Sequence, residues 1–365
     1  MSQVYIKNIR AKKIEKEIKA ILTSIGYLPK NKKIFIKPNV CGLYKPNSPC
    51  IVNPRVVGGV IEYLKDNGYR DILIGELPVP KDTDGVFTIS GYRLLSKKYN
   101  VKLTDLSFCA RGRLELGDLS IELPELLLNN EYEYINIAKM KTHIQTKISL
   151  CTKNQKGLVD FTGRRIMHVK GDLHENIKLL GRMIKPDFCI IDSINALEGD
   201  GPGISGTEIM KLNVIILGES MDAVDWVGAQ LMGIEPVTVR HLSMPREEIS
   251  IIGENMEEVK REFLLPKTHF QKFNIHFWVT DKTCSGCSEI IGGIKKSLIK
   301  SPICLLRFLW QAFFGRIDIL TGGVDIPDRH GKLICLGDCM EEKCKLHNLS
   351  IIKGCPPDVR DFLTL

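Results

Sequence analysis

Four cysteines in the last quarter of the chain constrain its fold more than any other feature of the sequence. They stand in three short pieces: Cys284-Ser285-Gly286-Cys287, Gly337-Asp338-Cys339 and Gly354-Cys355-Pro356-Pro357. Each piece follows an apolar run typical of a strand, and the runs are Asn274–Thr280, Lys332–Leu336 and Leu349–Lys353. Helix-like stretches, Ser288–Lys300 and Met340–His347, alternate with them. Because the carboxyl ends of parallel strands share one edge of a sheet, we expect the four thiolates to converge on one metal site.

The spacing of these cysteines favours an iron–sulfur cluster. Four thiolates are the usual ligands of a [4Fe–4S] cluster, and the neighbouring glycines let the backbone approach a bulky inorganic core. Structural zinc sites usually combine two close clips, whereas here one Cys-x-x-Cys clip is joined by two isolated cysteines. We therefore predict a [4Fe–4S] cluster, with zinc as the alternative and disulfides after zinc. Cys344 is a reserve ligand, and Cys335 and Cys304 are expected to be buried.

The motifs C-S-G-C-S-E, G-D-C-M and G-C-P-P resemble the proximal-cluster segment of the small subunit of nickel–iron hydrogenases and of the related complex I subunit. The resemblance implies a small flavodoxin-like α/β domain in which Cys284, Cys287, Cys339 and Cys355 hold a [4Fe–4S] cluster. It covers only the last part of the chain. Nothing resembles the nickel-bearing subunit, so hydrogenase activity is not expected.

Length and composition set the remaining bounds. A chain of 365 residues suggests two domains, which we place at residues 1–272 and 273–365. Twelve cysteines and an N-terminus without an apolar signal favour a cytoplasmic location. A net charge of +8 is compatible with an anionic substrate, with an acidic redox partner, or with solubility alone. No Lys/Arg stripe is interleaved with aromatics, so no nucleic-acid partner is expected.

One apolar run requires a check for membrane insertion. Residues Ile303–Phe314 are strongly apolar, but Arg307 interrupts them and they fall short of the roughly 20 residues of a span. We expect no transmembrane span, and interpret this run as a buried helix or a docking face, with an interfacial helix as a lesser alternative.

Residues before position 240 alternate between short apolar runs and helix-like stretches. Expected strands are Lys33–Ile36, Ile72–Gly75, Tyr134–Ile137, Phe188–Ile191 and Val214–Leu217, and expected helices are Ile9–Leu22, Pro54–Asn67 and Met221–Met232. Continuous apolar strands alternating with helices predict an α/β fold with a mostly parallel, covered sheet. Residues 240–272 are charged and irregular, and are expected to end the domain and form the linker.

Polar residues accumulate where these strands end, which is where α/β enzymes keep their chemistry. The candidate catalytic residues are Lys141, His143, Lys153, His168, Asp192 and Glu198. The candidate cofactor-binding residues are Lys37, Asn39, Glu76, Asn154, Gly157 and Gly201. The lysines of this region, which also include Lys139 and Lys156, can hold carboxylate or phosphate groups. The histidines can act as acid, base or metal ligand. Taken singly, each residue has a structural explanation, and standard nucleotide-binding motifs are absent.

Several motifs resemble the domain-of-unknown-function family 362 over about residues 30–240. They include K-P-N after a strand, K-x-K-T-H, K-N-x-K-G, D-S-I-N-A-L-E-G-D-G-P and D-A-V-D-W. That family has no established general reaction, many members carry a C-terminal iron–sulfur module, and it is distantly similar to the lactate-racemase-type fold. The resemblance marks the candidate residues above together with Asp222 and Asp225, of which we expect Asp222 to be mostly a helix N-cap.

These expectations combine into a functional hypothesis. The chain is expected to be an iron–sulfur oxidoreductase or electron-transfer protein that couples one cluster to an anionic substrate, or to a second, unidentified cofactor, in a Lys/His/carboxylate cleft. A redox partner protein is compatible with this. The alternatives are a non-redox isomerase- or racemase-like enzyme with a structural cluster, and a metallocentre assembly or binding protein.

Overall fold

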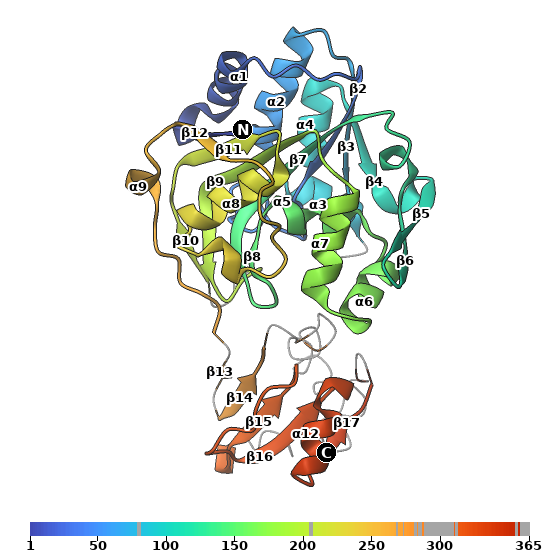
Figure 1. The fold of residues 1–365 in the computed structure, drawn as a ribbon, viewed down its shortest axis with the longest axis vertical. Helices are drawn as coiled ribbons and strands as arrows, with labels where there is room; N and C mark the ends of the chain where they lie inside the picture. The colour runs from blue at the N-terminus through green and yellow to red at the C-terminus, as the bar shows by residue number, and fades with distance from the viewer. Residues whose placement is uncertain are drawn as a thin grey trace. The chain divides into compact units, whose positions relative to one another are not determined.

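The computed structural model describes residues 1–78, 82–203, 207–267, 269–272, 274–280, 283, 287, 310, 313–354 and 357. The chain divides into two compact units, Met1–Pro266 and Lys267–Leu365. Figure 1 labels their helices and strands. Each unit is described by itself.

The large unit is built on one sheet of ten strands, eight of which form the continuous order β12-β1-β11-β9-β7-β2-β3-β4. The strands are β1 (Ser2–Asn8), β2 (Lys33–Pro38), β3 (Asp71–Glu76), β4 (Lys102–Asp105), β7 (Glu133–His143), β8 (Lys147–Ser149), β9 (Phe188–Gly199), β10 (Thr207–Met210), β11 (Val214–Gly218) and β12 (Ile249–Gly253). The neighbours β9, β7, β2, β3 and β4 are parallel, whereas β11, β8 and β10 pair antiparallel. The predicted α/β class with a large, mostly parallel sheet is confirmed.

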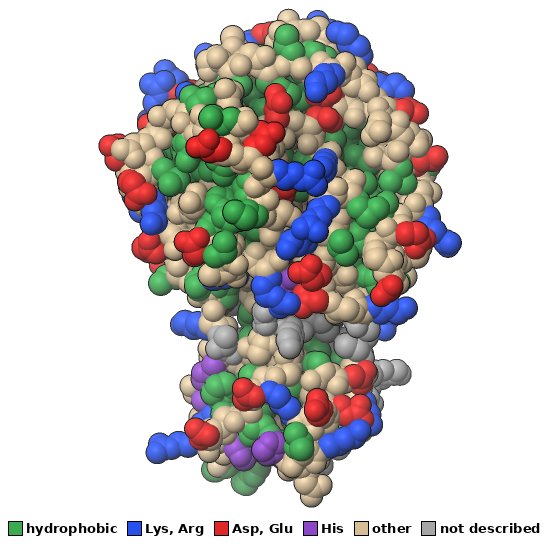
Figure 2. All heavy atoms as spheres, in the orientation of Figure 1, with side chains coloured by type: hydrophobic (Ala, Val, Ile, Leu, Met, Phe, Trp, Pro, Cys, Tyr) green, Lys and Arg blue, Asp and Glu red, His purple; other side chains and the backbone are tan. Residues whose placement is uncertain are grey.

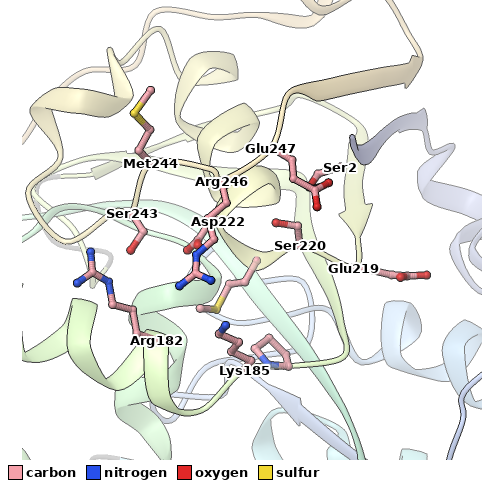
Figure 3. A pocket seen from close by; sticks show the side chains of 13 residues that line it. Ser2, Arg182, Lys185, Glu219, Ser220, Asp222, Ser243, Met244, Arg246 and Glu247 are labelled. Carbon is pink, nitrogen blue, oxygen red and sulfur yellow. The ribbon is translucent and has the colours of Figure 1, made fainter.

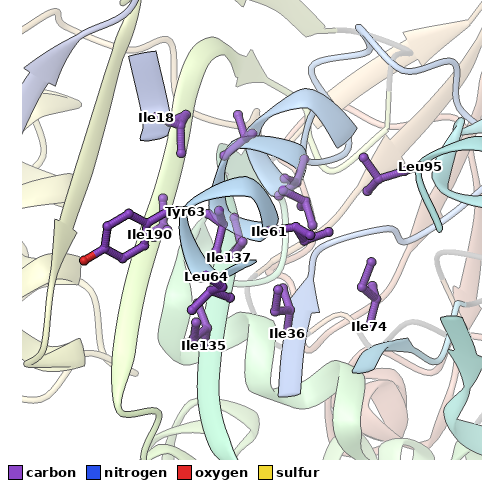
Figure 4. Packing of buried hydrophobic residues seen from close by; sticks show 14 of the residues in the cluster. Ile18, Ile36, Ile61, Tyr63, Leu64, Ile74, Leu95, Ile135, Ile137 and Ile190 are labelled. Atoms are coloured by element: carbon purple, nitrogen blue, oxygen red, sulfur yellow. The ribbon is translucent and has the colours of Figure 1, made fainter. Parts of the chain in front are cut away.

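Helices cover both faces of this sheet. They are α1 (Ile14–Ile25), α2 (Pro54–Asp66), α3 (Thr83–Ile89), α4 (Tyr92–Tyr99), α5 (Cys151–Asn154), α6 (Phe161–Val169), α7 (Leu173–Met183), α8 (Met221–Leu231) and α9 (Met256–Val259). Alternate residues of β2 enter different cores. Ile34 and Ile36, the latter labelled in Figure 4, pack with residues of α1, α2 and α4, whereas Phe35 packs with residues of α6 and α7. Burial on both faces is why the strands read as continuous apolar runs.

Three features of the large unit differ from the expectations. The strands β1, β4, β8, β10 and β12 were missed, and a separate hairpin is formed by β5 (Arg111–Leu116) and β6 (Leu119–Pro124). Helix α1 begins at Ile14 rather than Ile9. The N-cap of α8 is Ser220, whose hydroxyl accepts from the Ala223 N–H, so the assignment of Asp222 as the cap was wrong.

The small unit contains a five-stranded sheet in the order β13-β14-β15-β16-β17. Its elements are β13 (His269–Lys272), β14 (Ile275–Trp278), β15 (Ile317–Leu320), β16 (Lys332–Leu336), β17 (Ile351–Ile352) and α12 (Glu341–Leu346). Strands β14 to β17 are parallel, and the antiparallel β13 lies in the region expected to be linker. The described strands follow chain order, without the reversal that a doubly wound sheet shows, so the flavodoxin-like expectation is not confirmed.

Two surface features bear on the expectations. Over the face shown in Figure 2, Lys/Arg and Asp/Glu side chains are interspersed. The expected helix Ser288–Lys300, and most of the apolar run Ile303–Phe314, lie outside the described residues; within that run Trp310, Phe313 and Phe314 are exposed. Within the part of the chain that the structure describes, no helix has the length and apolar character that a membrane span requires.

Candidate functional site

The carboxyl edge of the large sheet brings most of the predicted polar residues together. From β2 the chain proceeds outward through β3 and β4, whereas β7 and β9 lie on the other side of β2. The strand order therefore reverses between β2 and β7, which is where ligands bind in open α/β sheets. Lys37 is the last residue but one of β2, and Glu76 is the last residue of β3. Strand β7 continues past its predicted end, so that Lys139, Lys141 and His143 lie on one face of it.

Two of the lysines at this edge are neutralised by carboxylates. Lys37 Nζ lies 2.9 Å from Glu76 Oε2 and donates to Asn154 Oδ1 at 2.8 Å. Lys139 Nζ lies 3.0 Å from Asp192 Oδ2. All four charged side chains are almost fully buried, and burial lowers the pKa of both lysines while their carboxylates oppose that shift. These residues form two internal ion pairs of the kind that buried charges require.

Neighbouring backbone N–H groups donate to the carboxylates of both ion pairs. Glu76 also accepts from the Val40 and Leu77 N–H groups, and Asp192 accepts from those of Asn53 and Ile194. Gly157 packs directly against the Lys37–Glu76 ion pair, and a Cβ at this position would lie 2.7 Å from Lys37 Nζ. The predicted cofactor-binding residues Lys37, Glu76, Asn154 and Gly157 thus contact one another.

Lys141 has no carboxylate partner among the described residues. Its ammonium donates to Asn39 Oδ1 at 2.8 Å and to the Cys50 carbonyl at 3.0 Å, and lies 3.6 Å from Cys41 Sγ. Asn39 is thereby placed at the site, although it holds a lysine. A buried cation with neutral partners retains its capacity to bind an anion.

Around Lys141 lies a set of residues that we call the cationic cluster: Lys141, His143, Lys153, Lys156 and His168. Burial lowers the pKa of His143 well below its usual range, and Lys153, Lys141, Lys156 and His168 lower it further. Burial likewise lowers the pKa of Lys153 well below its usual range, with Lys156 and Lys141 adding to the effect. The cluster therefore gathers the predicted catalytic residues Lys141, His143, Lys153 and His168.

The two histidines of the cationic cluster are held in defined tautomers. His143 Nδ1 accepts from the Gln145 N–H at 3.1 Å, which leaves Nε2–H as a donor without a partner among the described residues. His168 Nε2 contacts Lys156 Nζ, and burial followed by Lys156 and Lys153 lowers the pKa of His168 to about 2. Both rings are neutral near pH 7, so His143 offers a hydrogen bond and His168 supports a lysine.

Sequence reasoning missed a buried histidine, His241. It is fully buried, and neither ring nitrogen has a hydrogen-bond partner among the described residues. After burial, His174 and then Lys153 lower its pKa well below the usual range, so it lies near the cationic cluster. Its neighbours Arg240 and Leu242 carry no motif, and only the fold reveals its position.

Glu198 and Gly201 do not join the cationic cluster. Glu198 Oε2 accepts from the Leu264 N–H at 2.8 Å. Gly201 lies against β7, where a Cβ would come within 2.1 Å of the Thr142 carbonyl oxygen. Asp225 accepts from the Cys151 and Thr152 N–H groups and so caps α5. These three residues support the local structure around the site.

A separate cavity of about 310 Å³ lies at the opposite edge of the sheet. It is lined by Ser2 at the start of β1 (Figure 3) and by Pro186 just before β9. Arg182, Lys185 and Arg246 line it together with Asp222. None of the predicted catalytic residues reaches it.

In the small unit, two predicted cluster ligands converge on a glycine. A Cβ on Gly337 would lie 3.3 Å from Cys287 Sγ and 3.4 Å from Cys339 Sγ. Gly337 has a φ of +88°, and the Gly354 carbonyl oxygen, which precedes Cys355, lies 3.8 Å from the same point. The Gly322 N–H donates to Cys339 Sγ at 3.3 Å. All three cysteine-bearing pieces therefore approach one position.

The other cysteines of this unit have different surroundings. Cys284 and Cys355, the two remaining predicted ligands, lie outside the described residues, as does Cys304. Cys335 and Cys344 are buried in one apolar cluster with Leu320 and Met340, and burial and Cys344 raise the pKa of Cys335. Among the described residues no three His, Cys, Asp or Glu side chains form a metal site.

Comparisons with known proteins identify a family. A family model described as "Domain of unknown function (DUF362)" matches residues 34–230. The thylakoid-associated protein sll1697 of Synechocystis sp. is 25% identical over 216 residues, which are 57% of this chain and 65% of that protein. The chain thus spans just under two thirds of that relative's length. No solved structure matches the chain.

Proposed function

The chain belongs to the DUF362 family of unknown function, and within that family we propose that it is an iron–sulfur oxidoreductase. In this proposal the small unit holds one [4Fe–4S] cluster, and the large unit binds an anionic substrate in the cationic cluster. The cluster supplies one-electron transfer when it is bound. The residues of the large unit bind and orient the substrate.

The observation that carries the proposal is the space at Gly337. Any side chain there would meet the sulfurs of both Cys287 and Cys339, so the absence of a Cβ leaves room between two thiols from distant parts of the chain. The Gly322 N–H directed at Cys339 Sγ is the kind of hydrogen bond that tunes cluster sulfurs. The resemblance to the proximal-cluster segment of hydrogenase small subunits adds Cys284 and Cys355 as the other two ligands.

The anionic substrate is inferred from which lysines have a carboxylate partner and which do not. Lys37 and Lys139 carry their own carboxylates, whereas Lys141 and Lys153 have none among the described residues. His143 adds an unpartnered N–H to the same cluster. A carboxylate or phosphate group would supply the missing negative charge and accept these hydrogen bonds.

Cysteine usage supports a location in a reducing compartment. None of the nine cysteines that the structure describes forms a disulfide. Disulfides are rare in the cytosol, so we propose a cytoplasmic location. The relative sll1697 is named as thylakoid-associated, and this chain's association with a membrane surface is a question for fractionation.

The proposal is tested by iron and acid-labile sulfide analysis, with EPR after dithionite, on protein purified without oxygen. We expect about four iron and four sulfide per chain and the signal of a reduced [4Fe–4S]⁺ cluster. Cys339→Ser and Cys287→Ser should lose or convert the cluster, while Cys109→Ser, a change at a half-buried cysteine of the large unit, should retain it.

Three other results are informative. Finding zinc without sulfide would show that the cysteines hold a structural metal instead of a cluster, and would contradict the proposed redox function. A cluster that dithionite cannot reduce reversibly would favour the non-redox enzyme with a structural cluster. Full cluster content in both ligand variants would contradict the ligand assignment.

A further inference from the structure

The cavity of about 310 Å³ at the amino edge of the large sheet, where β1 and β9 begin, collects positive charge from separate segments of the chain. Arg182 lies in the last turn of α7, Lys185 lies between α7 and β9, and Arg246 lies in the segment before β12. Figure 3 shows the Arg246 and Lys185 side chains pointing toward one another. The fold therefore brings three cations to the wall of one cavity.

These three cations have no carboxylate partner among the described residues. Arg182, Lys185 and Arg246 make neither a hydrogen bond nor an ion pair with any of them. By contrast, Arg240, on the same segment as Arg246, pairs with Asp172. All three cations are exposed, so a ligand that arrives from solvent can reach them. Their donors remain available for the charge-assisted hydrogen bonds that an anion accepts.

The cavity also contains a half-buried carboxylate, Asp222. Ser220 caps α8, so the Asp222 carboxylate is not needed as the cap, and it makes no hydrogen bond or ion pair with a described residue. Burial raises the pKa of Asp222, whereas the three cations, together with Lys178 of α7, oppose that shift. The carboxylate and the cations are thus within electrostatic reach of one another without touching, and the cavity lies between them.

The charges that line the cavity do not balance. Two other carboxylates line it, but Glu247 lies 2.7 Å from the Met1 amino group, and Glu219 is exposed and points away from the cations in Figure 3. Three cations against Asp222 leave an excess of positive charge. A phosphomonoester, with a charge of about −1.5 to −2 near pH 7, matches this excess. The first N–H groups of α8, which have no acceptor within the helix, face the same cavity through Met221 and Asp222.

We propose that this cavity binds a small, soluble phosphomonoester that also carries a hydroxyl group. Its phosphate lies among Arg182, Lys185 and Arg246, and Asp222 accepts a hydrogen bond from its hydroxyl. Arginine is suited to phosphate because the guanidinium offers parallel N–H donors. The cavity volume is near the lower end of the range for ligand sites, which fits a small molecule. The site lies at the edge of the sheet opposite the cationic cluster, so the inference is independent of the proposed redox function.

The test is isothermal titration calorimetry on the full chain, purified without oxygen, with glycerol 3-phosphate as the probe. We expect one site per chain with a dissociation constant below about 1 mM, and no binding of glycerol. Arg182→Gln and Arg246→Gln should each weaken binding about tenfold or more, because each removes charged hydrogen bonds to the phosphate. Arg113→Gln, a change at an exposed arginine of β5, is the matched control and should leave binding unchanged.

A second comparison tests the part of the ligand that Asp222 recognises. Inorganic phosphate should bind about tenfold more weakly than glycerol 3-phosphate, because it has no glycerol hydroxyl to donate to Asp222. Asp222→Ala should remove this preference. Equal binding of the two ligands to the wild type would overturn the assignment of a hydroxylated ester.

The remaining outcomes locate the site. Binding that is lost in Lys141→Ala but retained in both arginine variants would place the ester in the cationic cluster and overturn the inference. Failure of glycerol 3-phosphate to bind at 10 mM, on the order of ten times the expected dissociation constant, would overturn it as well. Binding that depends on Arg182 and Arg246 in protein without iron and sulfide would support this inference while contradicting the proposed function.

Discussion

Gly157 shows how a single missing side chain makes room for a buried ion pair. A Cβ there would lie 2.7 Å from Lys37 Nζ and 2.8 Å from Glu76 Oε1, and neither group can move into solvent. We predict that Gly157→Ala destabilises the large unit by about 1–3 kcal/mol through overpacking. Chemical denaturation of purified variants measures this.

Gly203→Ala is the matched control for this prediction. Its Cβ would lie 3.5 Å from the Tyr44 hydroxyl oxygen, which is an ordinary contact, so we expect little change. Equal stability of the two variants would mean that the Lys37–Glu76 pair adjusts freely, and the pair would then not constrain the loop that carries Lys156.

The residues themselves were easier to predict than their roles. Lys37, Glu76 and Asn154 were predicted to bind a cofactor because each follows or lies near a strand end. In the structure they satisfy one another, since β2 and β3 are adjacent and α5 covers their ends. Strand order determines which charges pair, and no local pattern encodes it. The same reason explains why His241 was missed.

At the scale of elements, apolar runs located strands but underestimated their length. The prediction ended one strand at Ile137, whereas β7 continues to His143 with every residue buried. The continuation contains Lys139, Lys141 and His143, which look like loop residues by composition. They remain in the strand because Lys139 pairs with Asp192 on the neighbouring β9 and because β8 pairs with the end of β7. Tertiary partners overrode local propensity here.

Asp225 links two elements, since it lies on α8 and caps α5. Burial raises its pKa to about 6 from an ordinary value of 3.8. Between about pH 4 and pH 6, the Asp225 carboxyl is therefore protonated in the folded state and ionised in the unfolded state. The resulting stabilisation is complete below about pH 4 and is lost as the pH rises through 6. We predict that the wild type loses about 3 kcal/mol more stability over this interval than Asp225→Asn.

Denaturation of both proteins at pH 4, 5, 6 and 7 measures the difference in slope. The absolute stability of Asp225→Asn will be lower, because an amide has one acceptor oxygen for two backbone N–H groups. The comparison of slopes is unaffected by that constant loss. Parallel curves for the two proteins would show that Asp225 titrates alike in the folded and unfolded states.

At the scale of the whole molecule, the two units differ in how much apolar core they contain. The large unit has three extensive clusters of buried side chains on the two faces of its sheet. One described core cluster of the shorter small unit, Lys267–Leu365, consists of Leu320, Cys335, Met340 and Cys344, and further residues of its sheet such as Ile317, Ile319 and Leu336 are buried as well. A small core stabilises a domain weakly, and a bound metal centre commonly provides the remainder. We therefore expect the units to respond differently to loss of the proposed cluster.

We predict that removing the cluster with ferricyanide and EDTA lowers the melting temperature of the small unit by 10 °C or more, on the order of what a metal-dependent small domain loses. The transition of the large unit should stay within about 2 °C of its original value, since its core contains none of the predicted ligands. Differential scanning calorimetry resolves the two transitions, and limited proteolysis assigns each to its unit. Cys339→Ser, treated identically, is the control and should show no further shift because its cluster is already lost. An unchanged small-unit transition after complete removal of iron would show that this sheet folds without metal, and the converging thiols of Cys287 and Cys339 would then need another explanation.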